Sequence, residues 1–234
     1  MKWKFRLVGV VGVAGTVTLM LSVPAAAAVH SKDFAGYIAT SATGITSFTG
    51  TLSLPTVTCP ATGSPSVEPQ IFLSGDSLYS IDFTWFAGCS NGSLSLIAAE
   101  ADFCPNAGSF CSPIGAINAA PGDSLQFAMS ESTKTSTTTL KLTDSTKKQT
   151  ASASVHALLS ETSIQAGTLF CCGTGNITPI PSFTPIKFGN LKFNGAILSS
   201  FSPIRYEMYD GTTLQAATSS ISATGAFTNT FKHV

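Results

Sequence analysis

Short stretches in which apolar and polar residues alternate recur through most of the chain, with turn residues between them. In Ser47–Leu54, for example, Phe48, Leu52 and Leu54 alternate with Ser and Thr. A period of two is typical of β-strands that bury one face. The same pattern predicts further strands over 70–73, 78–86, 93–103, 124–130, 138–143, 151–164, 187–196, 204–209 and 221–231. These strands, without a convincing helix, predict an all-β protein built as an antiparallel β-sandwich.

Residues 1–28 have a different pattern, which is typical of a secretion signal. Three basic residues lie within the first six, an uncharged apolar run covers 7–23, and Ala26-Ala27-Ala28 forms a small-residue cleavage site. The run is shorter than the ~20 residues that a membrane span needs. We therefore expect cleavage after Ala28, and we expect residues 29–234 to form a single secreted domain that is free of the membrane.

Removal of the signal makes the chain acidic. The full sequence has 12 Lys and Arg residues and 12 Asp and Glu residues, and cleavage removes three of the basic ones. Nucleic-acid binding needs a basic patch, and the sequence has no basic run that would supply one. We expect an extracellular monomer that binds no nucleic acid.

Six cysteines in an exported chain indicate disulfide bonds. They are Cys59, Cys89, Cys104, Cys111, Cys171 and Cys172. Cys104 and Cys111 are close enough in sequence to close a small loop together. A bond between the adjacent Cys171 and Cys172 would close a strained ring, so we expect each of them to pair with Cys59 or Cys89. The sequence has no C-x-x-C pair and its three histidines are scattered, so we expect no metal and no cofactor.

Several short motifs resemble those of the glutamic peptidases, or eqolisins, and follow the same order. They are Phe34-Ala35-Gly36, Phe48-Thr49-Gly50, Leu54-Pro55, the segment Glu100–Pro105, the turn Pro121–Ser124, and Phe188-Gly189 with Phe193. The resemblance extends over nearly the whole mature chain. It implies a concanavalin-like double β-sandwich in which one sheet bends into a concave, substrate-binding cleft.

The resemblance also implies a mechanism in which a Glu activates a water and a Gln stabilises the oxyanion. Glu161 stands where the family carries its catalytic Glu. Strand alternation would place Glu161 on the same face as Leu159 and Ser163. The segment that matches the family's Gln strand is one residue shorter and has Tyr79 in place of the Gln. Tyr79 or Ser80 would then have to donate the hydrogen bond to the oxyanion.

Two further carboxylates match polar positions of the family's cleft. Glu100 corresponds to a Glu that lines the cleft, and Asp82 corresponds to an Asp near the catalytic Gln. Both are expected to contact a peptide or protein substrate. A glycosidase would instead need two facing carboxylates such as Glu100 and Glu161.

Three functions remain open at the level of sequence. The chain is an acid endopeptidase that uses Glu161 with Tyr79 or Ser80, or a pseudoenzyme that binds peptide, protein or glycan in the cleft, or a structural protein without a ligand. Phe83, Trp85 and Phe86 would stack on sugar rings in a glycan binder. In either of the other two cases they would fill the core.

Overall fold

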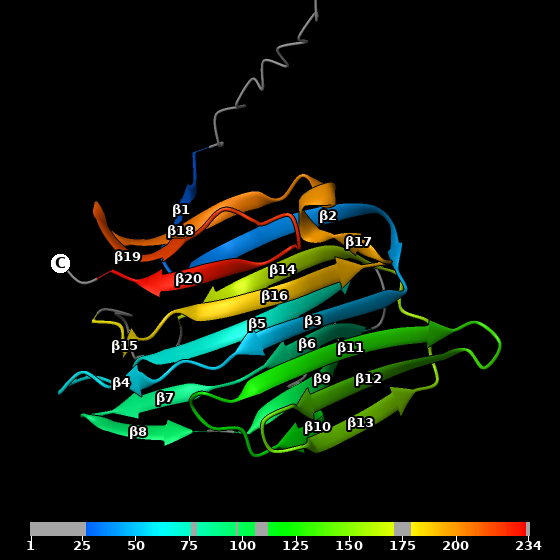
Figure 1. Ribbon diagram of the computed structural model, residues 1–234, viewed down its shortest axis with the longest axis horizontal. Helices are drawn as coiled ribbons and strands as arrows, with labels where there is room; N and C mark the ends of the chain where they lie inside the picture. The colour runs from blue at the N-terminus through cyan, green and yellow to red at the C-terminus, as the bar shows by residue number, and fades with distance from the viewer. Residues whose placement is uncertain (1–26, 76–78, 97, 106–111, 171–178, 233–234) are drawn as a thin grey trace, which may run out of the picture.

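The computed structural model describes residues 27–75, 79–96, 98–105, 112–170 and 179–232. It is built almost entirely from β-strands (Figure 1). The strands are β1 (Val29–Ser31), β2 (Phe34–Ile45), β3 (Ser47–Ser53), β4 (Val57–Thr58), β5 (Ser66–Gly75), β6 (Tyr79–Thr84), β7 (Ala87–Ser90), β8 (Ser93–Leu96), β9 (Ala99–Pro105), β10 (Ser112–Ile117), β11 (Ser124–Ser132), β12 (Thr137–Asp144), β13 (Gln149–Val155), β14 (Glu161–Leu169), β15 (Ser182–Phe183), β16 (Ile186–Phe193), β17 (Ala196–Ile197), β18 (Ile204–Asp210), β19 (Thr213–Thr218) and β20 (Phe227–Phe231). The helical content of the described residues is one 3-10 turn, η1 (Leu198–Phe201).

The long strands form two layers that are joined along one edge. The first sheet has the order β10-β9-β6-β5-β14-β2-β18, and every neighbouring pair in it is antiparallel. The second sheet has the order β13-β12-β11-β3-β16-β20-β19, again antiparallel throughout. Strand β18 also pairs with β19, so the chain passes from one layer into the other without a break in hydrogen bonding. The predicted antiparallel β-sandwich is confirmed.

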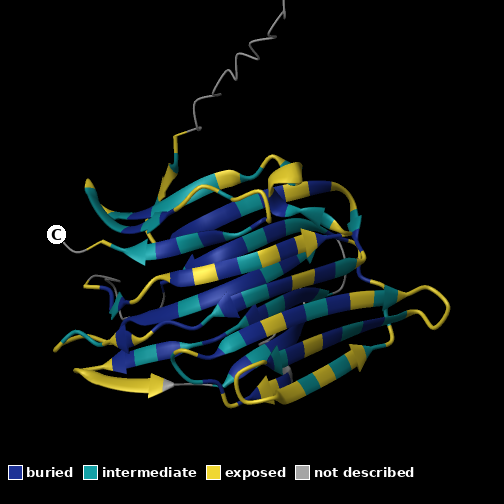
Figure 2. Cartoon of the chain, viewed as in Figure 1, coloured by how far each residue is buried: buried dark blue, intermediate teal, exposed yellow. Residues whose placement is uncertain are grey.

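Aromatic side chains connect the two layers through the core. Phe83 of the first sheet contacts Phe48 and Phe127 of the second, with ring centroids 5.8 and 5.2 Å apart. All three rings are buried, and buried residues follow the middle of the strands while exposed ones gather at the turns (Figure 2). Phe83 and Trp85 are fully buried, so they belong to the core and form no platform for a sugar ring.

Alternation located most strands correctly but did not show where two of them end. The predicted strand 93–103 is divided into β8 and β9, and the predicted strand 151–164 is divided into β13 and β14. Alternation did not predict β1, β2, β4, β7, β10, β15 and β19. Two of these, β10 (SPIGAI) and β19 (TLQAAT), are short and carry little apolar–polar contrast, so their pairing partners define them.

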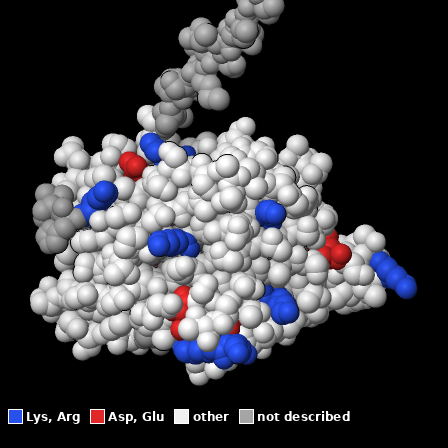
Figure 3. Space-filling view, viewed as in Figure 1, with Lys and Arg blue, Asp and Glu red and all other residues white. Residues whose placement is uncertain are grey.

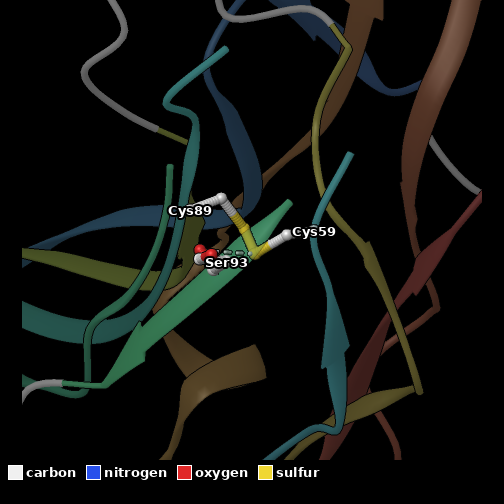
Figure 4. Close-up of a disulfide and its surroundings, with 3 residues drawn as sticks. All are labelled: Cys59, Cys89 and Ser93. Atoms are coloured by element: carbon white, nitrogen blue, oxygen red, sulfur yellow. Dashed lines mark hydrogen bonds between the residues drawn. A yellow bond between two sulfur atoms is a disulfide. The ribbon is translucent and has the colours of Figure 1, made fainter. Parts of the chain in front are cut away.

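One disulfide overturns the predicted cysteine pairing. Cys59 bonds to Cys89, which lies 30 residues further along the chain (Figure 4). Neither residue is therefore available to Cys171 or Cys172, which lie outside the described residues together with Cys111. Cys104 is also in a disulfide. The bond between Cys59 and Cys89 ties the segment after β4 to β7 at one end of the sandwich.

A membrane-spanning helix can be looked for only among the described residues. No helix among them is long and apolar enough to cross a membrane. Most of the expected signal, residues 1–26, lies outside the described part of the chain.

Candidate functional site

Four carboxylates gather on the outer face of the first sheet. Asp82 in β6 lies directly opposite Asp102 in β9, and Glu100 lies opposite Thr84 two residues away. Directly opposed side chains in an antiparallel pair have Cβ atoms about 5 Å apart. The charges of Asp102, Glu68 and Glu100 all act on Asp82, so the four carboxylates form one cluster. We call this cluster the acidic face.

No cation shares this part of the sheet. The sequences of β2, β5, β6, β9, β10 and β14 contain no Lys or Arg. Figure 3 shows the other side of the molecule, formed by the second sheet, where Lys and Arg side chains are scattered over the surface and gather at the lower edge. The strands that carry the acidic face therefore supply no Lys or Arg of their own to balance its carboxylates when these are ionised.

Burial and crowding change how the acidic face titrates. Burial, followed by the charges of the neighbouring carboxylates with Asp102 first, raises the pKa of Asp82 to about 8. One Asp82 carboxyl oxygen, Oδ1, is buried without a hydrogen-bond partner in the described residues. Burial also raises the pKa of Glu100 and the pKa of Glu68. At Glu68 a 2.9 Å hydrogen bond from the Ser66 hydroxyl opposes this rise, because it stabilises the ionised carboxylate. Near neutral pH Asp82 therefore holds a proton beside Asp102.

Apolar and amide groups continue the same face beyond the carboxylates. Phe72 of β5 lies opposite Asp82 of β6 on one side and opposite Gln165 of β14 on the other. Gln70 of β5 lies opposite Thr84 of β6. Further along, the Phe34 ring covers Gly36 and Gly167, which pair with each other. A Cβ on either glycine would lie 2.7 Å from a ring atom, so only glycine leaves room for the ring. This packing explains the aromatic-Ala-Gly motif found in the sequence, because the ring of Phe34 needs a glycine two residues later.

Glu161 lies elsewhere, on the core side of the sheet. It is the first residue of β14 and is opposite Gly75 and Ile45, with no exposed surface. A Cβ on Gly75 would lie 3.0 Å from Glu161 Oε2, so the carboxylate occupies the space that this glycine leaves open. Gly75 has the same parity as the buried Leu73, which faces the core.

The predicted face of Glu161 was wrong because the strand contains a bulge. The register shifts between Glu161 and Ser163 in both pairings of β14. An extra residue reverses the alternation, so Ser163 lies with the outer residues while Glu161 lies with the inner ones. Local sequence gives no signal for such a bulge, because it depends on two partner strands.

The two predicted oxyanion donors lie on opposite faces. Tyr79 has the parity of the buried Ile81 and packs edge-on against Phe103, with centroids 6.4 Å apart. It therefore shares the core side with Glu161. Ser80 has the other parity, is buried, and donates a 3.3 Å hydrogen bond to the Cys104 carbonyl oxygen. The predicted catalytic set is thus divided between the two sides of the sheet.

The predicted substrate-contacting residues are brought together. Asp82 and Glu100 lie on the same face, within reach of each other's charge. Sequence reasoning missed Asp102 and Glu68. Parity gave a usable signal for Asp102, because it is two residues from Glu100 in a strand and must share its face. Glu100 and Glu161 lie on opposite sides, which does not fit a facing glycosidase pair.

Comparison with solved structures identifies the architecture. The scytalido-glutamic peptidase, solved with a peptide-based transition-state analogue, superposes with a TM-score of 0.61 at 13% identity, over 86% of this chain and 99% of that one. This chain has the glutamic-peptidase fold. SCP-B, a member of the eqolisin family solved with the tripeptide Ala-Ile-His, gives a TM-score of 0.57 at 14% identity, over the same shares. No protein-family model and no curated protein sequence matches the chain.

Within the glutamic-peptidase fold, the described side chains offer no metal centre. No group of three or more His, Cys, Asp or Glu residues in the described part of the chain is arranged to hold a metal ion. What the acidic face offers chemically is a set of carboxyl groups, of which Asp82 has its pKa raised to about 8, next to aromatic and amide side chains.

Proposed function

We propose that this chain is an extracellular peptide-binding protein on the glutamic-peptidase fold. A peptide lies along the acidic face, with its Lys or Arg side chains towards the partly exposed Glu68 and Glu100. The observation that carries the proposal is the cation-free face of β5, β6 and β9, because opposite charge steers and orients a ligand. The disulfide between Cys59 and Cys89 supports an oxidising, extracellular location.

The proposal does not assign the chemistry to Glu161. A general base must come within hydrogen-bond reach of the water that it activates, and this side chain is fully enclosed on the core side. Ser80 donates its hydroxyl hydrogen to a backbone carbonyl. On the resemblance alone, Tyr79 stands where the family carries its Gln. Fold and site are separable, so a peptidase architecture persists readily without the peptidase reaction.

A second candidate is an acid endopeptidase in which Asp82 and Asp102 work as a pair. Two like charges this close do not both ionise readily, so a protonated Asp82 beside Asp102 can serve as a general acid. The ionised carboxylate would take a proton from the attacking water, and the protonated one would give its proton to the departing amine. The raised pKa of Asp82 beside Asp102 favours this candidate.

Peptide binding is tested by fluorescence anisotropy with a labelled peptide of alternating Lys and Ser and with a matched peptide of Glu and Ser. We expect the Lys peptide to bind and the Glu peptide not to bind, with an affinity that falls as salt rises. Glu100→Gln should raise the Kd about 2–5-fold, as expected for one partly exposed charge pair. Glu207→Gln removes a carboxylate from β18 and serves as the control. Equal binding of both peptides, or an equal effect of the control, would refute the proposal.

A further inference from the structure

A pocket of about 420 Å³ lies at the edge of the sandwich, apart from the acidic face. Its walls come from β2, from the start of β18 and from the loop that connects β19 to β20. Tyr37 and Arg205 form one side, Ser202 and Ser220 contribute hydroxyl groups, and Ile221 is among its apolar lining residues. The volume suits a small organic ligand.

Arg205 is the charged residue in this lining, and its guanidinium group has a hydrogen-bond donor to spare. Its Nε atom is buried without a hydrogen-bond partner among the described residues. A buried donor without an acceptor is costly, and such a group calls for an explanation such as a water or an ion. Tyr37 lies opposite Arg205 in register and donates its hydroxyl hydrogen to the Ser219 carbonyl oxygen at 2.7 Å.

The local charge balance favours an anion at this place. Glu207 has the parity of Arg205 in β18, but it is not among the residues that line the pocket. Burial raises the pKa of Tyr37, and the positive charge of Arg205 lowers it. The negative charge of Glu207 raises the same pKa, but by less than Arg205 lowers it. The field at the Tyr37 hydroxyl is therefore dominated by the guanidinium group.

We propose that this pocket binds the carboxylate of a small ligand that carries a branched apolar group. The carboxylate accepts hydrogen bonds from the Arg205 guanidinium and from the Ser202 and Ser220 hydroxyls, and the apolar end packs against Ile221. A guanidinium matches a carboxylate with two parallel hydrogen bonds, which gives this class of ligand an advantage over a neutral one.

Signal cleavage would change one wall of the pocket. Ala27, which lines the pocket, lies on the part of the chain that the expected cleavage removes. The new amino terminus, Val29, pairs with Tyr206, the neighbour of Arg205 in β18. Cleavage would therefore open one side of the pocket and leave an α-ammonium group on the strand that pairs with β18.

The test uses protein purified from the medium of a secreting host, labelled with ¹⁵N-arginine. Residues 29–234 contain one arginine, so the Arg205 Nε–H gives a single assigned signal in the NMR spectrum. Sodium isovalerate should shift that proton downfield in a saturable way, and isovaleramide, its neutral analogue, should not. A response that does not saturate, or an equal response to isovaleramide or to sulfate, would overturn the proposal.

Two variants separate the pocket from general electrostatics. Arg205→Lys keeps the positive charge but removes the planar guanidinium group, which can donate two parallel hydrogen bonds to a carboxylate. We therefore expect isovalerate to bind this variant at least about tenfold more weakly. The affinity is obtained from the rise in Tm with ligand concentration. Lys134→Gln removes an exposed cation from the turn between β11 and β12 and should leave the affinity unchanged. Equal weakening by both variants would show a nonspecific charge effect and contradict the assignment.

Discussion

Replacing Asp82 with asparagine should remove most of the dependence of stability on pH between mildly acidic and mildly alkaline conditions. The pKa of Asp82 is raised from 3.8 to about 8 in the folded protein, chiefly by burial and then by Asp102. Between these two values the folded chain holds the proton that the unfolded chain has lost. The free energy of unfolding therefore falls as pH rises, by about 1.4 kcal/mol per pH unit from this group.

The wild-type protein is thus expected to be most stable in acid and to lose stability until the pH passes the folded pKa of Asp82. Burial raises the pKa of Glu68 and Glu100 in the same direction, so they add to the slope at lower pH. The asparagine side chain of Asp82→Asn has no proton to lose and keeps nearly the same shape. The variant should consequently unfold at higher denaturant concentration than the wild type near pH 8.

Urea denaturation across this pH range measures the effect directly. Asp210→Asn, at an exposed position at the end of β18, is the matched control and should follow the wild-type curve. If Asp82→Asn shows the same slope as the wild type, then Asp82 is ionised in the folded protein and the paired-carboxyl description of the acidic face is wrong.

Removing the disulfide between Cys59 and Cys89 should cost about 3–4 kcal/mol of stability. The bond closes a loop with a sequence separation of 30 residues. Without it the unfolded chain regains the conformational freedom of that loop, and a loop of this length corresponds to roughly this free energy. Cys89 is also buried, so its replacement by Ser removes a little core packing.

The double variant Cys59→Ser/Cys89→Ser isolates this bond because it leaves the other cysteines unchanged. Urea denaturation of the variant and the wild type gives the difference in the free energy of unfolding. Serine at both positions keeps the side-chain size, so the loss should come mainly from the unfolded state. A difference below about 1 kcal/mol would mean that the loop is already restricted in the unfolded chain.

The elements that alternation predicted well are those whose pattern depends on one buried face. Ser47–Leu54 is an example, because Phe48 and Leu52 are buried while Ser47 and Thr51 are not. The turn at Pro121-Gly122-Asp123 was also predicted from local chemistry. Gly122 has a φ of +90°, and the Asp123 carboxylate accepts a 2.7 Å hydrogen bond from the Ala120 amide.

The site was harder to predict because it depends on pairing between distant strands. Asp82 and Asp102 are far apart in sequence, and they meet only because β6 and β9 pair in one particular register. A shift of a single residue would move one of them to the other face. Glu161 shows the same effect, since a bulge that needs both β2 and β5 turns it towards the core.

That the glutamic-peptidase fold carries no Glu161 chemistry in this chain is tested most directly by incubating the secreted protein with a denatured protein substrate from strongly acidic to neutral pH. Fragments are detected by mass spectrometry, with Glu161→Gln and Asp82→Asn measured beside the wild type. We expect an intact substrate with correctly folded wild-type protein at every pH. Acid cleavage that disappears in Glu161→Gln would contradict it, and cleavage that disappears only in Asp82→Asn would establish the paired-aspartate peptidase instead.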